Sequence, residues 1–140
     1  AYQMIRALAP LMKRNPGAGI VNISSVAAVM GVGSSVAYMA SKGALNAMTF
    51  GLARALGPEI RVNAIGPGMV ETPWLQNGLG AEQYDARRKA YRAATPLAET
   101  IQPEDVADAA YFLCDGARKT TGEFMLVDSG FVKYATLPRG

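Results

Sequence analysis

Histidine is absent from this sequence of 140 residues, and cysteine occurs only once, at Cys114. Hydrolases of the Ser-His-Asp and Cys-His types need a histidine base, and the common zinc sites combine several histidines and cysteines. The composition therefore excludes these chemistries, and no metal site is expected. A lone cysteine also excludes a disulfide within the chain and is typical of a reducing compartment, so we expect a cytoplasmic location. Cys114 itself lies in an apolar stretch and is expected to be packed in the core.

Long runs of one charge and long apolar runs are also missing. The formal net charge is +3 and the basic residues are scattered, so the chain has no tract suited to nucleic acid. No apolar run reaches the roughly 18 residues that a membrane-spanning helix needs, and we expect no membrane partner. What remains is the composition of an ordinary globular α/β domain, with 50% hydrophobic and 18% charged residues.

Short apolar runs alternate with helical patterns along the chain. Three runs have the character of strands: residues 20–24, 60–65 and 123–127. The first of them, short and mostly apolar, suits a strand buried on both faces of a parallel sheet. Four segments have helical character: residues 1–14 with a kink at Pro10, 36–56, 73–94 with a break at 78–80, and a helix beginning at Pro103. This alternation predicts a parallel α/β sheet.

Three side chains between Ser25 and Lys42 form a combination suited to proton transfer. Tyr38 and Lys42 are four residues apart in a predicted helix, so their side chains lie on one face about a turn apart. A neighbouring ammonium favours the phenolate, which allows Tyr38 to act as a general acid or base. Ser25 lies thirteen residues before Tyr38, in a loop after the first strand, where its hydroxyl can bond a substrate oxygen. The Tyr-Lys spacing alone is common on solvated helix faces, so the pair needs further support.

That support comes from motifs in a fixed order: N-I-S-S at 22–25, the Tyr38 and Lys42 pair, R-V-N-A-I-G-P-G at 61–68 and V-D-S-G at 127–130. Together they resemble the short-chain dehydrogenase/reductase family over essentially the whole chain. The resemblance implies a Rossmann-like fold, with residues 1–140 as a single partial domain that forms the second half of a doubly wound parallel sheet. The family's glycine-rich phosphate loop has no counterpart in residues 1–24 and is expected to lie before Ala1.

The resemblance also implies a role for each matching residue. NAD or NADP would carry the hydride, Ser25 would orient the substrate oxygen, and Tyr38 would exchange its proton. Lys42 would support the tyrosine and bind the nicotinamide ribose. The expected cofactor contacts are Tyr38, Lys42, Pro67, Gly68, the Val70 backbone and the Thr72 hydroxyl. The expected substrate contacts are Ala27, Trp74 and Leu75, of which the last two belong to residues 73–94, a predicted movable lid over a small carbonyl or alcohol substrate.

Two alternatives to an oxidoreductase remain open at this point. The chain is either a catalytic half or a non-catalytic half-domain that only folds or oligomerises with a missing partner. A hydrolase with an activated serine is weaker, because neither S-x-x-K nor G-x-S-x-G occurs.

A stripe of small residues in the 36–56 helix allows another helix to approach closely: Ala37, Ala40, Ala44, Ala47, Gly51 and Ala55. The stripe either packs against the sheet or forms a homo-oligomer interface with the 1–14 helix. The family resemblance favours the interface.

Overall fold

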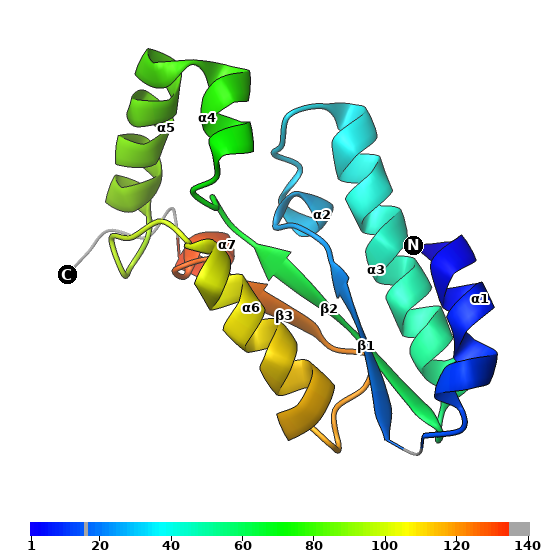
Figure 1. Ribbon diagram of the computed structural model, residues 1–140. Coiled ribbons are helices and arrows are strands. Elements are labelled where there is room, and N and C mark those ends of the chain that lie inside the picture. The colour runs from blue at the N-terminus through cyan, green and yellow to red at the C-terminus, as the bar shows by residue number, and fades with distance from the viewer. Residues whose placement is uncertain (16, 135–140) are drawn as a thin grey trace.

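The computed structural model describes residues 1–15 and 17–134. Its centre is a three-stranded parallel sheet in the order β1 (Ala18–Ile23), β2 (Ile60–Pro67) and β3 (Phe124–Val127) (Figure 1). Ala18 pairs with Ile60 at one end of the β1–β2 ladder and Ile23 with Ile65 at the other. The predicted parallel α/β sheet is confirmed, and each strand lies within three residues of its predicted bounds.

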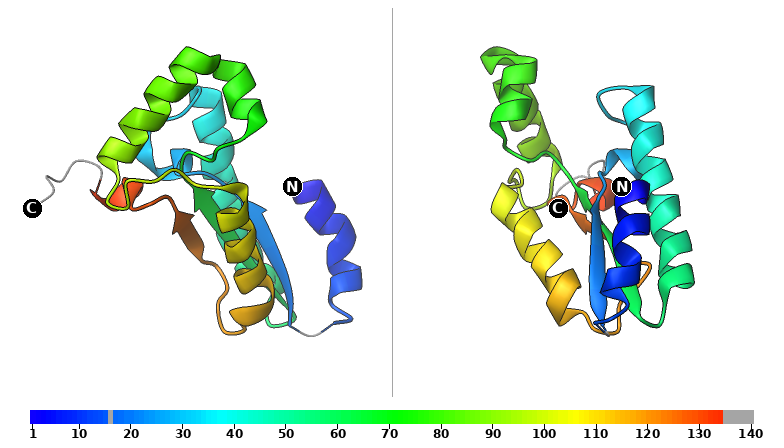
Figure 2. Two further views of the ribbon diagram at one scale, coloured as in Figure 1. Left: turned by 60° about the vertical axis from the view of Figure 1, so that its left-hand side comes forward. Right: turned by 45° about the vertical axis from the view of Figure 1, so that its right-hand side comes forward.

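Helices cover both faces of this sheet. Helices α1 (Tyr2–Met12) and α3 (Val36–Leu56) lie on one face, and α6 (Pro103–Tyr111) lies on the other (Figure 2). One hydrophobic cluster joins α1, α3 and β2 through Ala9, Ala53, Ile60 and Val62. A second cluster joins β2 to the α6 side through Ile65, Leu113 and Ala117. β2 is the centre of both clusters and is buried along its whole length.

β1 differs from the prediction that its residues are buried on both faces. Its first four residues are only half-buried, and Ile23 is 45% exposed. The reason is its place in the sheet, because β1 is an edge strand that pairs only with β2 among the described residues. Burial on both faces was therefore a wrong prediction for β1, and the strand that is buried throughout is β2, at the centre of the sheet.

The segments at the carboxyl ends of the strands contain more helix than expected. The loop after β1 includes a single helical turn, α2 (Ala27–Met30), and the turn after β3 leads into α7 (Phe131–Tyr134). The predicted helical region at 73–94 is divided into α4 (Pro73–Leu79) and α5 (Ala81–Ala94), with Gly80 at φ 77° between them. Both helices stand beyond the carboxyl edge of the sheet (Figure 1).

The end of α6 corrects one expectation about the core. Helix α6 runs into a π-helical turn (Phe112–Gly116), in which Leu113 is fully buried and Cys114 is exposed. Leu113 takes the core position of this turn, so Cys114 faces outward. The Arg61 guanidinium of β2 donates hydrogen bonds to the carbonyls of Leu113 and Cys114, both at 2.6 Å, which fixes the turn against the sheet.

The helices of the described residues include none that combines the length and the apolar character needed to cross a membrane.

Candidate active site

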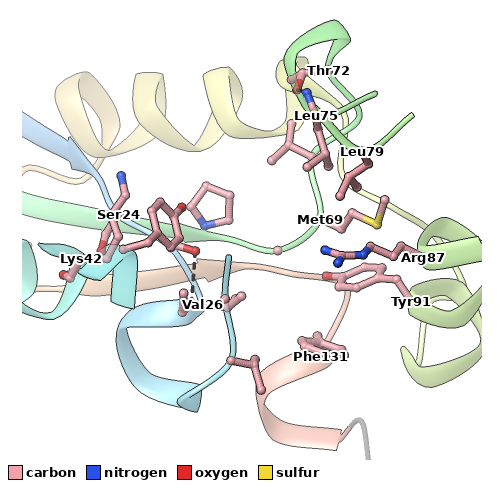
Figure 3. Close-up of a pocket in the computed structure, with 18 of the residues that line it drawn as sticks. Ser24, Val26, Lys42, Met69, Thr72, Leu75, Leu79, Arg87, Tyr91 and Phe131 are labelled. Carbon is pink, nitrogen blue, oxygen red and sulfur yellow. Dashed lines mark hydrogen bonds between the residues drawn. The ribbon is translucent and has the colours of Figure 1, made fainter. Parts of the chain in front are cut away.

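A cavity of about 680 Å³ opens at the carboxyl ends of β1 and β2 and extends under α4 and α5 (Figure 3). Open parallel sheets bind ligands at this edge, and the volume is within the range of about 300–1,000 Å³ that is usual for small-molecule sites. The walls of the cavity bring together every residue that the sequence singled out as a catalytic, cofactor or substrate contact: Ser25, Ala27, Tyr38, Lys42, Pro67, Gly68, Val70, Thr72, Trp74 and Leu75.

Tyr38 and Lys42 are placed by the first turns of α3. Ser35 caps this helix, its Oγ accepting a hydrogen bond from the Tyr38 N–H at 3.1 Å. One turn further on, the Lys42 Nζ lies 5.7 Å from the centroid of the Tyr38 ring. The same ammonium donates to the Ile23 carbonyl at 2.9 Å, so the end of β1 holds it beside the phenol. The two side chains therefore share one wall of the cavity.

Ser24 and Ser25 both line the cavity but use their hydroxyls differently. The Ser24 Oγ is 3.3 Å from the Lys42 carbonyl and donates to it, so this hydroxyl ties the end of β1 to α3. The Ser25 Oγ accepts a hydrogen bond from the Ala27 N–H at 3.1 Å. Within the part of the chain that the structure describes, the Ser25 O–H has no acceptor of its own. Its proton is free to bond an oxygen in the cavity, which favours Ser25 over its neighbour.

The loop after β2 presents backbone groups to the cavity. Val70 forms a parallel bridge with Ile101, in which the Ile101 N–H donates to the Met69 carbonyl at 2.9 Å and the Glu71 N–H donates to the Ile101 carbonyl at 2.8 Å. These bonds leave the N–H and C=O of Val70 on the opposite side of the loop, with no backbone partner among the described residues. An adjacent donor and acceptor of this kind match a primary carboxamide, such as that of nicotinamide.

Thr72 completes this wall at the start of α4. Its Oγ1 accepts from the Leu75 N–H at 3.3 Å and caps the helix, while its O–H proton remains available. Gly68 lies against the Tyr91 hydroxyl, which a Cβ at this position would overlap. The residues present therefore fit the nicotinamide end of the cofactor that the sequence implied.

Some lining residues were missed by the sequence reasoning: Met69, Leu79, Arg87, Ala90, Tyr91, Ala94 and Phe131 (Figure 3). Four of them, at positions 87, 90, 91 and 94, follow helical spacing on α5, so periodicity could have identified the face of this helix that borders the cavity. The Tyr91 ring packs on Phe131 with 4.8 Å between centroids, and its hydroxyl donates to the Asp128 carbonyl at 2.5 Å. Burial raises the pKa of Tyr91, so this hydroxyl stays protonated as a donor. Phe131 lies beyond the last strand, where no local pattern points to the cavity.

Comparisons with known proteins all point to one family. The family model described as Enoyl-(Acyl carrier protein) reductase matches residues 1–132. The chain is 41% identical over 129 residues to a protein of Mediterraneibacter gnavus named 3alpha-hydroxysteroid dehydrogenase, which covers 91% of this chain and 50% of that protein. It is 38% identical over 125 residues to the short-chain dehydrogenase/reductase homolog YusR of Bacillus subtilis, covering 89% of this chain and 92% of YusR.

A solved structure supports the same assignment. The ligand-free aldohexose dehydrogenase of Thermoplasma acidophilum superposes with a TM-score of 0.87 at 29% identity, covering 99% of this chain and 57% of that one. The chain belongs to the short-chain dehydrogenase/reductase family, whose fold is Rossmann-like. It spans about half the length of most of the relatives it matches, and its three strands correspond to the second half of that fold.

Proposed function

We propose that this chain supplies the catalytic side chains of an NAD(P)-dependent oxidoreductase acting on a carbonyl or secondary alcohol. The observation that carries the proposal is the shared wall of the cavity, where Ser25, Tyr38 and Lys42 come from a loop and a helix that β1 ties together. No histidine is available as an alternative base. Membership of a family of dehydrogenases and reductases supports the same chemistry.

Each side chain has one task in this proposal. Ser25 donates its free O–H to the substrate oxygen and holds it beside the phenol. Tyr38 gives a proton to that oxygen during reduction and takes it back during oxidation. The Lys42 ammonium, fixed by the Ile23 carbonyl, lies 5.7 Å from the centroid of the Tyr38 ring and stabilises the negative charge that develops there during proton transfer. Electrostatic support of this kind is strong because the cavity is lined mostly by apolar side chains.

The nicotinamide cofactor, when bound, supplies or accepts the hydride. Pro67, Gly68, the Val70 backbone and the Thr72 hydroxyl would hold its nicotinamide end, and Tyr38 and Lys42 would contact its ribose. A dinucleotide also needs a glycine-rich turn at a helix N-terminus for its pyrophosphate, and no such turn follows a strand in these 140 residues. We propose that the phosphates are held by residues outside this chain, and we call the chain together with that nucleotide-binding half the assembled enzyme.

We also propose a homo-oligomer formed through α1 and α3. All six small residues of the α3 stripe are exposed, so the stripe does not pack against the sheet as one reading of the sequence required. Helix α1 adds exposed apolar side chains, with Met4 67% and Leu11 54% exposed. A small-residue surface beside an apolar one suits close helix pairing between two copies.

The test of the proposed function is Tyr38→Phe in the assembled enzyme. This variant keeps the ring and removes only the transferable proton, so we expect kcat to fall by about 10² to 10⁴. The dissociation constant for NADH or NADPH should change little, because one hydroxyl contact is lost. A Tyr38→Phe enzyme with the wild-type kcat would remove Tyr38 from the mechanism.

The alternative is that the chain is a half-domain that takes no part in catalysis. The position of β1 supports this alternative, because among the described residues β1 pairs only with β2 and its outer edge could pair with a strand of a missing partner. Fluorescence titration with NADH and NADPH separates the two. We expect no tight binding to the 140-residue chain alone and tight binding to the assembled enzyme. If the assembled enzyme also binds neither nucleotide, the chain serves assembly only and the oxidoreductase proposal fails.

A further inference from the structure

The end of the cavity away from Lys42 contains one charged side chain, Arg87, that the chemistry above does not use. Figure 3 shows Ser24 and Lys42 at one end of the cavity, and Arg87 reaching inward from α5 at the other end, near Met69 and Tyr91. Among the described lining residues, Lys42 and Arg87 are the only ones with a charge, and none is acidic. The Lys42 ammonium already donates a hydrogen bond to the Ile23 carbonyl. The second positive charge needs a separate explanation.

The other arginines of α5 already have partners. Arg88 forms ion pairs with Glu71 at 3.8 Å and Asp85 at 3.2 Å, and the Arg92 Nε donates to the Ala98 carbonyl at 2.9 Å. For Arg87, no acceptor lies within hydrogen-bond or ion-pair distance anywhere in residues 1–15 and 17–134. Its guanidinium is therefore the one on this helix with its donors free.

The acids closest to this end of the cavity are already committed. Glu71 accepts from the Thr100 hydroxyl at 2.5 Å as well as pairing with Arg88. The Asp128 carboxylate accepts the backbone N–H groups of Gly130 at 2.9 Å and Val132 at 2.8 Å. Neither carboxylate pairs with Arg87, so a carboxylate on a ligand would not have to displace either of them from the guanidinium.

Arg87 is the only charged residue on the face of α5 that borders the cavity, as far as the described residues go. The other residues of this face are Ala90, Tyr91 and Ala94, and the neighbouring side chains of Met69 and Phe131 are apolar. Arg87 is exposed in this structure, and its guanidinium offers paired N–H donors with a geometry that matches a carboxylate. We propose that Arg87 binds a carboxylate on the substrate, so that the enzyme acts on oxo acids or hydroxy acids whose reacting carbon lies at Tyr38. This inference rests on the proposed function, since it assigns the reacting carbonyl to the Ser25 and Tyr38 end.

The experiment uses the assembled enzyme with a series of oxo acids of increasing chain length, each compared with its methyl ester. Esterification removes the charge and leaves the ketone unchanged, so we expect the wild type to prefer one acid over its ester. Arg87→Met should raise KM for that acid about 10- to 100-fold, since a hydrogen bond between charged groups is lost. The ester KM and the kcat for the acid should stay within about twofold, because the reacting end is untouched.

Lys89→Met is the matched control, because it removes the same charge from an exposed residue of α5 that does not line the cavity. It should leave the preference for the acid intact. Arg87→Glu should reverse the preference, disfavouring the acid and favouring a ketone that carries an amine.

Three outcomes would overturn the inference. The first is that the wild type has equal KM values for the acid and its ester. The second is that Lys89→Met raises KM for the acid as much as Arg87→Met does. The third is that Arg87→Met loses affinity for NADH or NADPH, which would assign the arginine to a cofactor phosphate. Failure of the proposed function looks different, since no ketone or ester would then be turned over. Binding can be followed even in that case by the fluorescence of Trp74, which is the only tryptophan in these 140 residues and lines the cavity. Tighter binding of the acid than the ester that depends on Arg87 supports the inference, and equal binding overturns it.

Discussion

The two walls of the cavity are built in opposite ways. On one wall, the carboxyl ends of β1 and β2 and the start of α3 hold Ser25, Tyr38 and Lys42, and β2 is completely buried. On the other wall, α4 has no buried residue and α5 has only Tyr84 and Tyr91. The first wall is part of the core of the domain, whereas the second stands on it with few contacts. We expect the sheet wall to determine the chemistry and the α4–α5 wall to determine which substrate enters.

The difference follows from what each wall has to do. Proton transfer requires donor and acceptor positions fixed to a fraction of an ångström, which a packed sheet and its cross-links provide. A wall that admits and releases ligands has to be one of the less stable parts of the chain. Substitutions on the two walls should therefore affect different kinetic constants, and the following predictions test this division.

Of the substitutions that compare the two walls, Ser25→Ala on the sheet wall is expected to have the largest effect. Losing one oriented donor at the substrate oxygen should lower kcat of the assembled enzyme by about 10² to 10³. KM should change much less, because the carbon skeleton of the substrate keeps its contacts. Ser24→Ala is the matched control, since its hydroxyl is used only for the Lys42 carbonyl, and we expect a smaller loss. If steady-state kinetics showed a larger loss of kcat in Ser24→Ala than in Ser25→Ala, the roles assigned to the two serines would have to be reversed.

A smaller effect is expected where the two walls meet, from Gly68→Ala. The new Cβ would overlap the Tyr91 hydroxyl and come within 3.1 Å of the Asp128 Cα, so the ring has to move and its hydrogen bond to Asp128 is strained. We expect a loss of about 1–3 kcal/mol in the free energy of unfolding, measured by urea denaturation.

Gly78→Ala is the control for this experiment. Gly78 lies within α4, and a Cβ there meets no atom within 4 Å. Replacing a helical glycine by alanine should raise stability by about 0.5–1 kcal/mol. Equal losses for Gly68→Ala and Gly78→Ala would mean that the contact between Gly68 and Tyr91 does not connect the walls.

The smallest effect is expected on the lid wall, from Trp74→Ala. Trp74 is 80% exposed although it lines the cavity, so it has little contact to lose until a ligand is present. We expect KM for the substrate to rise a few-fold, roughly 1 kcal/mol or less, with kcat unchanged. Hydrogen exchange on the wild type should show residues 74–94 exchanging faster than 20–24. Equal protection of the two segments would contradict a movable lid.

The sequence predicted the parallel sheet, the bounds of α3 and the first residues of α4 and α6, because periodicity, Pro73 and Pro103 mark these features locally. It also placed ten residues that line one cavity, since the carboxyl ends of parallel strands meet at one edge. The exposure of Ile23 and Cys114 could not be predicted. Ile23 is exposed because β1 is an edge strand. Cys114 is exposed because Leu113 takes the core position of the π-helical turn.

The sequence predicted a lid at residues 73–94 but did not identify which residues of α5 border the cavity. Helical spacing alone could have grouped these residues on one face of α5. It could not have revealed that Arg88 pairs with Glu71, a residue seventeen positions earlier in the chain, while Arg87 lines the cavity.

We expect the Tyr91 anchor to make α5 act as a lever. Its carboxyl end is held by the hydroxyl bond to Asp128 and the ring contact with Phe131, whereas its amino end joins α4 through Gly80. A swing of this lever grows with distance from the pivot, and the helix of 14 residues is about 21 Å long. Trp74, beyond the far end, would travel the most. Arg87 lies about 6 Å along the helix axis from Tyr91 and the amino end of α5 about 15 Å, so Arg87 would move less than half as far as that end while the lid opens.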